Sequence, residues 1–392
     1  MIRIKSDKIF YDNGIFAKGT IDIEGDRIKA ISENGQTSIK DSDMDKEDII
    51  DATGMYVIPG LVDIHFHGCM GQDFCNGTIE AIETITKYEL LQGVTSISPA
   101  TMTLSREELK RIFTTAGEYT KGLTDENDIC SRSSIRGITM EGPFVSLAKK
   151  GAQNGDYIHK PDVEFYKEMQ EACGGLIKQV AVAPEEDEDL AFTKEISKEC
   201  VISVAHTAAE YDIADKAFKE GASHATHLFN AMPAFHHRDP GVIGAVVENE
   251  HVYAEMICDG VHIHPAMVRA MFKTLGAERI CMISDSMEAT GLTDGDYMLG
   301  GQAVKVKGKK ATLVDGTIAG SASNLMDCLR VAVKEMNIPV EQVVKACTIT
   351  PAKSLGIDGD IGSLEVGKMA DIVILDKELN IVKIIKSGKI IG

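Results

Sequence analysis

Residues 58–68 read Ile58-Pro59-Gly60-Leu61-Val62-Asp63-Ile64-His65-Phe66-His67-Gly68. The apolar run at residues 61–64 predicts a short buried strand, and two histidines follow it. Side chains two positions apart in an extended segment point to the same side, so His65 and His67 can present both imidazoles to one cation. Alone, such a pair is more often two exposed loop histidines. Its interpretation depends on what the chain places beside it.

Apolar runs of this kind recur along the middle of the chain, separated by amphipathic helical stretches. Ser105 and Glu108, for example, form a capping-box pattern that opens a helix running to Tyr119. Eight strands that alternate with helices predict a (β/α)₈ TIM-type barrel over residues 58–356. The predicted strands are residues 61–64, 94–98, 135–140, 179–182, 201–205, 224–228, 252–257 and 280–284.

Both ends of the chain have strand patterning without the helices. Residues 1–57 contain short apolar runs and a Gly25-Asp26 turn, and residues 357–392 return to the same pattern. Neither piece can close a core alone, so we expect one discontinuous β-sandwich domain built from both. Residues 295–315 are typical of a hairpin inserted before the last barrel helix, and the acidic segment 41–48 is typical of an exposed loop.

Composition limits the classes of partner. The chain has 41 Lys and Arg against 60 Asp and Glu, a formal charge of −19, which repels nucleic acid and anionic membranes. No apolar run is long enough for a signal peptide or a membrane span, and nine scattered cysteines without a CxxC pair suit reduced thiols. We therefore expect a cytoplasmic protein that binds neither nucleic acid nor membrane. An anionic substrate would need a dedicated pocket.

Potential metal ligands follow several of the predicted strands. They are His65, His67, Glu141, His206, His227 and Asp285. Barrel enzymes build their sites at the carboxyl ends of the strands, so these six side chains would meet. Imidazole and carboxylate without thiolate suit Zn²⁺ or Fe²⁺. Taken singly, Glu141 is also typical of a strand-terminal acid before a Gly-Pro turn, and Asp285 of a helix N-cap.

Two charged residues have expected chemical roles. A carboxylate beside a metal-activated water can accept its proton and return it to a leaving amine, which is the role we assign to Asp285. Arg238 is a natural phosphate anchor, because a guanidinium binds phosphate in bidentate fashion. The remaining histidines are interpreted as surface or structural residues: His159, His224, His236, His237, His251, His262 and His264.

Several motifs together resemble the N-acetylglucosamine-6-phosphate deacetylase family of the amidohydrolase superfamily. They are HFHG at 65–68, EGPF at 141–144, AHT at 205–207, THLFNAM at 226–232, DGVH at 259–262 and the glycine-rich tail at 362–374. The resemblance runs nearly from end to end. His-x-His and the tail are shared across the superfamily, whereas EGPF and HLFNAM narrow the resemblance to this family.

The resemblance implies deacetylation of N-acetylglucosamine 6-phosphate in amino-sugar catabolism and cell-wall sugar recycling. It implies metal ligation by Glu141, His206 and His227, with Asp285 as catalytic acid and base. One or two ions are implied, since some relatives lack the first-strand histidines that this chain keeps. The implied substrate contacts are Gln153, Asn230, the Ala231 backbone, Arg238, His262, Ile318, Ala319 and Gly320.

The resemblance also implies a homodimer, in which His262 reaches across the interface. In some relatives a histidine at the position of Gln153 polarises the amide carbonyl, so carbonyl activation here must rest on metal or on another donor. Two alternatives stay open. The first is a different amidohydrolase, such as a cyclic-amide hydrolase or a purine deaminase. A cyclic-amide hydrolase is disfavoured because it would carry a carboxylated lysine after the fourth strand, where this chain has Val182-Ala183-Pro184-Glu185. A catalytically silent scaffold is disfavoured because all six potential ligands are present.

Overall fold

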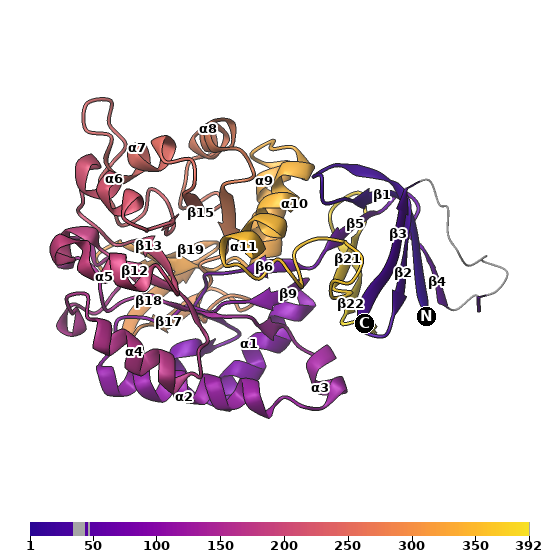
Figure 1. Ribbon diagram of the computed structural model, residues 1–392, viewed down its shortest axis with the longest axis horizontal. Coiled ribbons are helices and arrows are strands. Elements are labelled where there is room, and N and C mark those ends of the chain that lie inside the picture. The colour runs from indigo at the N-terminus through magenta and orange to yellow at the C-terminus, as the bar shows by residue number, and fades with distance from the viewer. Residues whose placement is uncertain (34–43, 46–47, 392) are drawn as a thin grey trace.

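The computed structural model describes residues 1–33, 44–45 and 48–391. A large α/β part lies beside a smaller sheet (Figure 1). Most of the acidic segment 41–48, expected to be an exposed loop, lies outside the described residues.

Strands from both ends of the chain form one eight-stranded sheet, at the right of Figure 1. Its order is β23-β22-β21-β5-β1-β2-β3, with β4 paired to β1. The two ends meet at β5, which runs parallel to β1 and antiparallel to β21, with Ile58 opposite Val373. The strands are β1 (Ile2–Phe10), β2 (Phe16–Glu24), β3 (Arg27–Glu33), β4 (Ile49–Asp51), β5 (Tyr56–Pro59), β21 (Ile372–Leu375), β22 (Ile381–Lys386) and β23 (Lys389–Ile391).

The strands of this sheet share an apolar core. Ile4 of β1, Ile21 of β2 and Ile372 of β21 all lie in it. The predicted turn between β2 and β3 is present, and Gly25 adopts a φ of +63° that glycine tolerates best. This core holds strands from both chain ends together.

Parallel strands make up the centre of the larger part, and each of the eight predicted segments contains one. They form a three-stranded sheet, β10-β9-β6, and a six-stranded sheet from β11 to β16. Ala100 pairs with Thr139 at one junction, and the Asp285 N–H donates to the His65 carbonyl at 3.1 Å at the other. The strands are β6 (Leu61–Asp63), β9 (Val94–Ile97), β10 (Ser134–Ile135), β11 (Ile138–Met140), β12 (Ile177–Val182), β13 (Val201–Val204), β14 (His224–Ala225), β15 (Tyr253–Ile257) and β16 (Ile280–Ile283).

Helices lie around these strands (Figure 1). The predicted capping box is confirmed: Ser105 Oγ accepts the Glu108 N–H, and the Glu108 carboxylate accepts the Ser105 N–H. Among the described residues, no helix combines the length and the apolarity needed to cross a membrane. The helices are α1 (Ile79–Leu91), α2 (Arg106–Gly122), α3 (Glu126–Cys130), α4 (Val163–Ala172), α5 (Ala191–Ile196), α6 (Tyr211–Lys219), α7 (Gly241–Glu248), α8 (Pro265–Leu275), α9 (Leu325–Lys334), α10 (Val340–Cys347) and α11 (Ile349–Ser354).

The structure has more strands than the hairpin predicted at residues 295–315. The segment forms a four-stranded antiparallel sheet that continues to Ser321, because a fourth short strand follows the predicted ones. Leu299 and Ala319 pack its inner face against Met102 and Met287. The strands are β17 (Gly295–Leu299), β18 (Gln302–Lys307), β19 (Lys310–Leu313) and β20 (Ile318–Ser321); a separate pair joins β7 (Gly68–Cys69) to β8 (Gln72–Asp73).

Candidate active site

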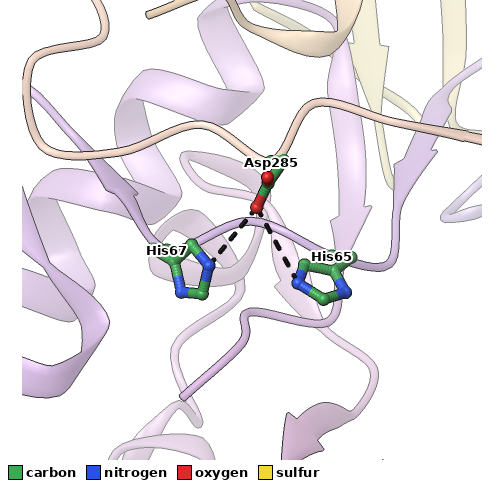
Figure 2. Close-up of side chains that lie close together, drawn as sticks. All are labelled: His65, His67 and Asp285. Atoms are coloured by element: carbon green, nitrogen blue, oxygen red, sulfur yellow. Dashed lines mark ion pairs between the residues drawn. The ribbon is translucent and has the colours of Figure 1, made fainter. Parts of the chain in front are cut away.

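Two groups of potential metal ligands lie at the carboxyl ends of the parallel strands. One group is Glu141, His206 and His227; the other is His65, His67 and Asp285, drawn in Figure 2. The ligand atoms of each group lie within 4.8 Å of one another, and all six side chains are buried. The structure therefore brings together every residue that the sequence predicted as a metal ligand.

Three of these residues leave their strands through a left-handed backbone conformation. The φ angles are +43° at His206, +30° at His227 and +50° at Asp285. Residues with a Cβ avoid this region, at a cost of about 1–3 kcal/mol each, and such positions cluster at functional sites. Here the abrupt strand ends place all three side chains on the wall of one pocket.

Glu141 lies between the two groups. Its Oε1 is 3.1 Å from His206 Nε2, 3.2 Å from His227 Nε2 and 3.4 Å from His65 Nε2. Burial alone would raise the pKa of Glu141, but these histidines hold it well below its usual range. An ionised carboxylate oxygen among imidazole nitrogens is a donor set that suits a divalent cation.

The orientation of the histidines supports this interpretation. His65 Nε2 is buried without a hydrogen-bond partner, and the Nε2 atoms of His206 and His227 approach each other to 3.2 Å. His206 Nδ1 lies 3.0 Å from the Lys149 carbonyl, which can only accept. The proton therefore lies on Nδ1, and Nε2 is free to bind a cation. These residues fit a bound divalent metal.

Asp285 is the carboxylate of the second group. Its Oδ1 lies 3.3 Å from His67 Nε2 and 3.8 Å from His65 Nε2, the ion pairs marked in Figure 2. Burial alone would raise the pKa of Asp285, but the hydrogen bond and charge of His67 lower it. The alternative role of helix N-cap is not supported, since in the described chain no helix begins at residue 286. Asp285 is therefore an ionised carboxylate beside the ligand groups.

A pocket of about 380 Å³ opens beside the two groups. Ala319, predicted as a substrate contact, is not among the residues that line the pocket and packs into the core of the β17–β20 sheet. The predicted substrate residues that line the pocket are Gln153, Asn230, Ala231, His262, Ile318 and Gly320.

Two predicted contacts need correction. His262 was expected to come from a partner subunit, yet it lines the pocket of its own chain. Asp259 holds it there, because its carboxylate accepts the Val261 and His262 N–H groups and lies 2.8 Å from His262 Nδ1. Arg238 is not on the wall of this pocket: it lies on an exposed loop and lines a second hollow with Tyr211 and Asp239.

A sequence model of the amidohydrolase family matches residues 56–391. The chain belongs to this family. The amidohydrolase is 34% identical over 388 residues to the N-acetylglucosamine-6-phosphate deacetylase of Bacillus subtilis, covering 99% of this chain and 96% of that one. It is 36% identical over 344 residues to the enzyme of the same name from Lysinibacillus sphaericus, covering 88% and 87%.

Solved structures agree with these relatives. The N-acetyl-D-glucosamine-6-phosphate deacetylase of Mycobacterium smegmatis, in a mutant form bound to N-acetyl-D-glucosamine 6-phosphate, matches with a TM-score of 0.90 at 29% identity. The match covers 99% of this chain and 98% of that one. The family resemblance inferred from the motifs is thus confirmed.

Two residues of the amidohydrolase site were not singled out by sequence. Lys149 is the one Lys or Arg among the described residues that line the pocket, and its Nζ lies 3.4 Å from the Met232 carbonyl. Glu255 lies in β15, directly behind His65. An acid inside the apolar run of β15 is a usable signal for Glu255, whereas Lys149 ends a short 3-10 helix (Leu147–Lys149) that has no recognisable sequence pattern.

Proposed function

We propose that this chain is a metal-dependent deacetylase that hydrolyses N-acetylglucosamine 6-phosphate to glucosamine 6-phosphate and acetate, in amino-sugar catabolism. The observation that carries the proposal is the position of Asp285, an ionised carboxylate of the second ligand group that lies on the wall of the same pocket as Glu141, His206 and His227. Two relatives that are 34% and 36% identical bear the name of this activity, and a related structure holds this sugar phosphate.

The proposed metal site has two parts. Glu141, His206 and His227 hold one ion, and His65, His67 and Asp285 hold a second, with Zn²⁺ or Fe²⁺ as the metal. A bound ion of this kind polarises the amide carbonyl and lowers the pKa of a bound water to roughly 7. Three protein ligands per ion leave a position for water or substrate, the pattern of catalytic sites.

Asp285 is the proposed carrier of the proton. Its carboxylate accepts a proton from the water that attacks the acetyl carbon. An amine anion is a prohibitive leaving group, so Asp285 donates this proton to the nitrogen as the C–N bond breaks. The sugar then leaves as a neutral amine, and the acetyl carbon keeps the water oxygen as acetic acid, which loses its remaining proton to solvent as acetate.

The sugar phosphate is proposed to occupy the pocket that Asn230, the Ala231 backbone, Ile318 and Gly320 line. Lys149 and His262 add positive charge to the wall, which offsets the repulsion between a phosphate and a chain of formal charge −19. Arg238 is exposed and outside the pocket of its own chain, so we assign it to the substrate phosphate of a second subunit in a homodimer.

Gln153 is proposed to position Glu141 and not to polarise the substrate. Its Nε2 donates to Glu141 Oε2 at 2.8 Å, and its Oε1 accepts the Thr103 N–H at 2.6 Å. Both ends of the amide are therefore occupied, so Gln153 has no free donor for the carbonyl of the substrate, which a bound metal or another donor would have to activate.

We also propose that the parallel strands close into a (β/α)₈ barrel over residues 58–356, with residues 1–57 and 357–392 as one β-sandwich domain. The backbone contacts at both junctions between the parallel sheets and the shared eight-stranded sheet support this division. The nine cysteines are free thiols, which supports a cytoplasmic location.

The test is acetate release from N-acetylglucosamine 6-phosphate by the metal-replete protein. The unphosphorylated sugar and N-acetylgalactosamine 6-phosphate serve as parallel substrates. We expect the highest kcat/KM for N-acetylglucosamine 6-phosphate. No acetate from either sugar phosphate would overturn the proposed function, and equal turnover of the unphosphorylated sugar would overturn the phosphate contacts.

A further inference from the structure

A fully buried carboxylate lies behind the metal ligands. Glu255 sits in the middle of β15 and is 0% exposed. Its Oε2 lies 3.1 Å from His65 Nδ1, while its Oε1 accepts the Gln179 N–H at 2.5 Å and lies 3.3 Å from His224 Nδ1. The three partners are also 0% exposed. A charge in such a place is costly unless it is paired, and both oxygens of Glu255 have partners.

The contact with His65 determines which of its nitrogens carries a proton. An ionised carboxylate only accepts hydrogen bonds, so the proton of that contact belongs to His65 Nδ1. His65 Nε2 then faces Glu141 and Asp285, at 3.4 and 3.8 Å, and has no hydrogen bond of its own. Glu255 therefore fixes both the ring orientation and the nitrogen that His65 offers to a cation.

The other ligand histidines are held differently. His206 Nδ1 is held by the neutral Lys149 carbonyl, whereas His67 Nδ1 and His227 Nδ1 are buried without a hydrogen-bond partner. Each metal group therefore contains one oriented histidine, and only the group of His65 has a charged acceptor behind it. A carboxylate behind a ligand histidine raises the basicity of the imidazole as well as orienting it.

We propose that Glu255 is a positioning residue that sets the affinity of the second metal position, the one formed by His65, His67 and Asp285. The proposal rests on the proposed metal-dependent function. It predicts that Glu255 controls one binding step and leaves the ion at Glu141, His206 and His227 unaffected.

The test is calorimetric titration of Zn²⁺ into the metal-free full-length protein, with metal content measured after dialysis. Glu255→Gln removes the charge, and we expect the Kd of the second ion to rise roughly 10–100-fold. The Kd of the first ion should stay within about twofold, because Glu255 does not contact its ligands. His65→Ala shows which of the two Kd values depends on His65. Glu255→Gln should raise that same Kd.

Gln179→Met is the matched control. It removes one hydrogen bond from the same buried carboxylate but keeps the charge and the contact with His65, so the second Kd should rise less than in Glu255→Gln and the first Kd should match the wild type. The same loss of affinity in Gln179→Met, or an unchanged second Kd in Glu255→Gln, would overturn the proposal. If Glu255→Gln does not fold, Glu255→Asp replaces it. This variant keeps the charge on a shorter side chain, so the second Kd should rise above the wild-type value by less than the roughly 10–100-fold expected for Glu255→Gln. An unchanged second Kd in Glu255→Asp would then contradict the proposal.

Uptake of a single ion by the wild-type protein would also overturn this inference. The proposed function is tested separately, by acetate release from the wild-type protein with whatever metal it binds. A one-metal deacetylase and a two-metal protein without activity are therefore distinguishable outcomes.

Discussion

At the scale of single residues, Asp285 is the side chain that separates a catalyst from a metal-binding scaffold. Asn has the same shape but cannot carry a proton, so Asp285→Asn should lower kcat by roughly a hundredfold to ten-thousandfold. The ion at Glu141, His206 and His227 should remain. Acetate release and metal content, measured on one preparation, check this. Near-normal kcat in a metal-replete variant would disprove the proton-transfer role.

Lys149 should contribute to recognition of the phosphate. Lys149→Met removes the cation from the pocket wall, and losing one hydrogen bond to a charged group should raise KM for the phosphorylated sugar roughly tenfold. Lys150→Met is the control, because Lys150 carries the same charge on the same loop but its Nζ contacts the Gln153 carbonyl and does not line the pocket. Similar KM values for the two variants would argue against the contact.

The pH dependence of substrate binding should involve His262. Burial alone would lower the pKa of His262, but the hydrogen bond and charge of Asp259 raise it above its ordinary value. The imidazolium is thus kept to higher pH, and affinity for glucosamine 6-phosphate should fall as pH rises through the raised pKa. Asp259→Asn removes the charge that raises this pKa, so the fall should begin at lower pH. The Kd for glucosamine 6-phosphate, measured as a function of pH, tests this. The fall in affinity should be absent from His262→Gln.

The sequence predicted the site residues that directly follow a strand. His65, Glu141 and Asp285 were predictable because parallel strands end at one edge, and the structure brings them together. Arg238 was expected on the wall of this pocket but lies on an exposed loop, because its charge does not determine which way such a loop points. Lys149 could not be predicted, since only the fold brings its loop to the pocket.

At the scale of elements, the N-terminus of α2 is a local contribution to stability that is separate from the chemistry. Ser105→Ala removes the side chain that accepts the Glu108 N–H, and the free energy of unfolding should fall by about 1 kcal/mol. Thr114→Ala, in the middle of α2, should be neutral or slightly stabilising because Ala is the better helix former. Urea unfolding measures both. Equal losses would mean that the cap is not the cause.

Element boundaries differ from the prediction where a strand changes its partner. Residues 135–140 were expected to be one strand, but β10 pairs with β9 and β11 pairs with β12, so the chain shifts from one sheet to the next between Ile135 and Ile138. Apolar patterning is the same on both sides of this shift. The partner of a strand depends on distant segments and is not encoded locally.

At the scale of the whole molecule, metal should control activity more than fold. The larger part has an extensive apolar core formed by its strands and helices, and the six ligand residues follow the ends of the strands, so a chelated protein should keep its circular dichroism while losing acetate release. Each ion at a hundred times its Kd should add about 2.7 kcal/mol to the free energy of unfolding, so the melting temperature should fall on chelation and recover with Zn²⁺. Full activity after chelation would contradict the metal-dependent reaction.

The pairing of β5 with β21 has a consequence for synthesis on the ribosome. Ile58 emerges first, and its partner Val373 follows about 300 residues later, which at roughly 5–20 residues per second is a delay of roughly 15–60 s. During that interval the nascent β5 has an open edge, to which another nascent chain can add a strand. The sheet at the chain ends is therefore the last part of the molecule that translation allows to close.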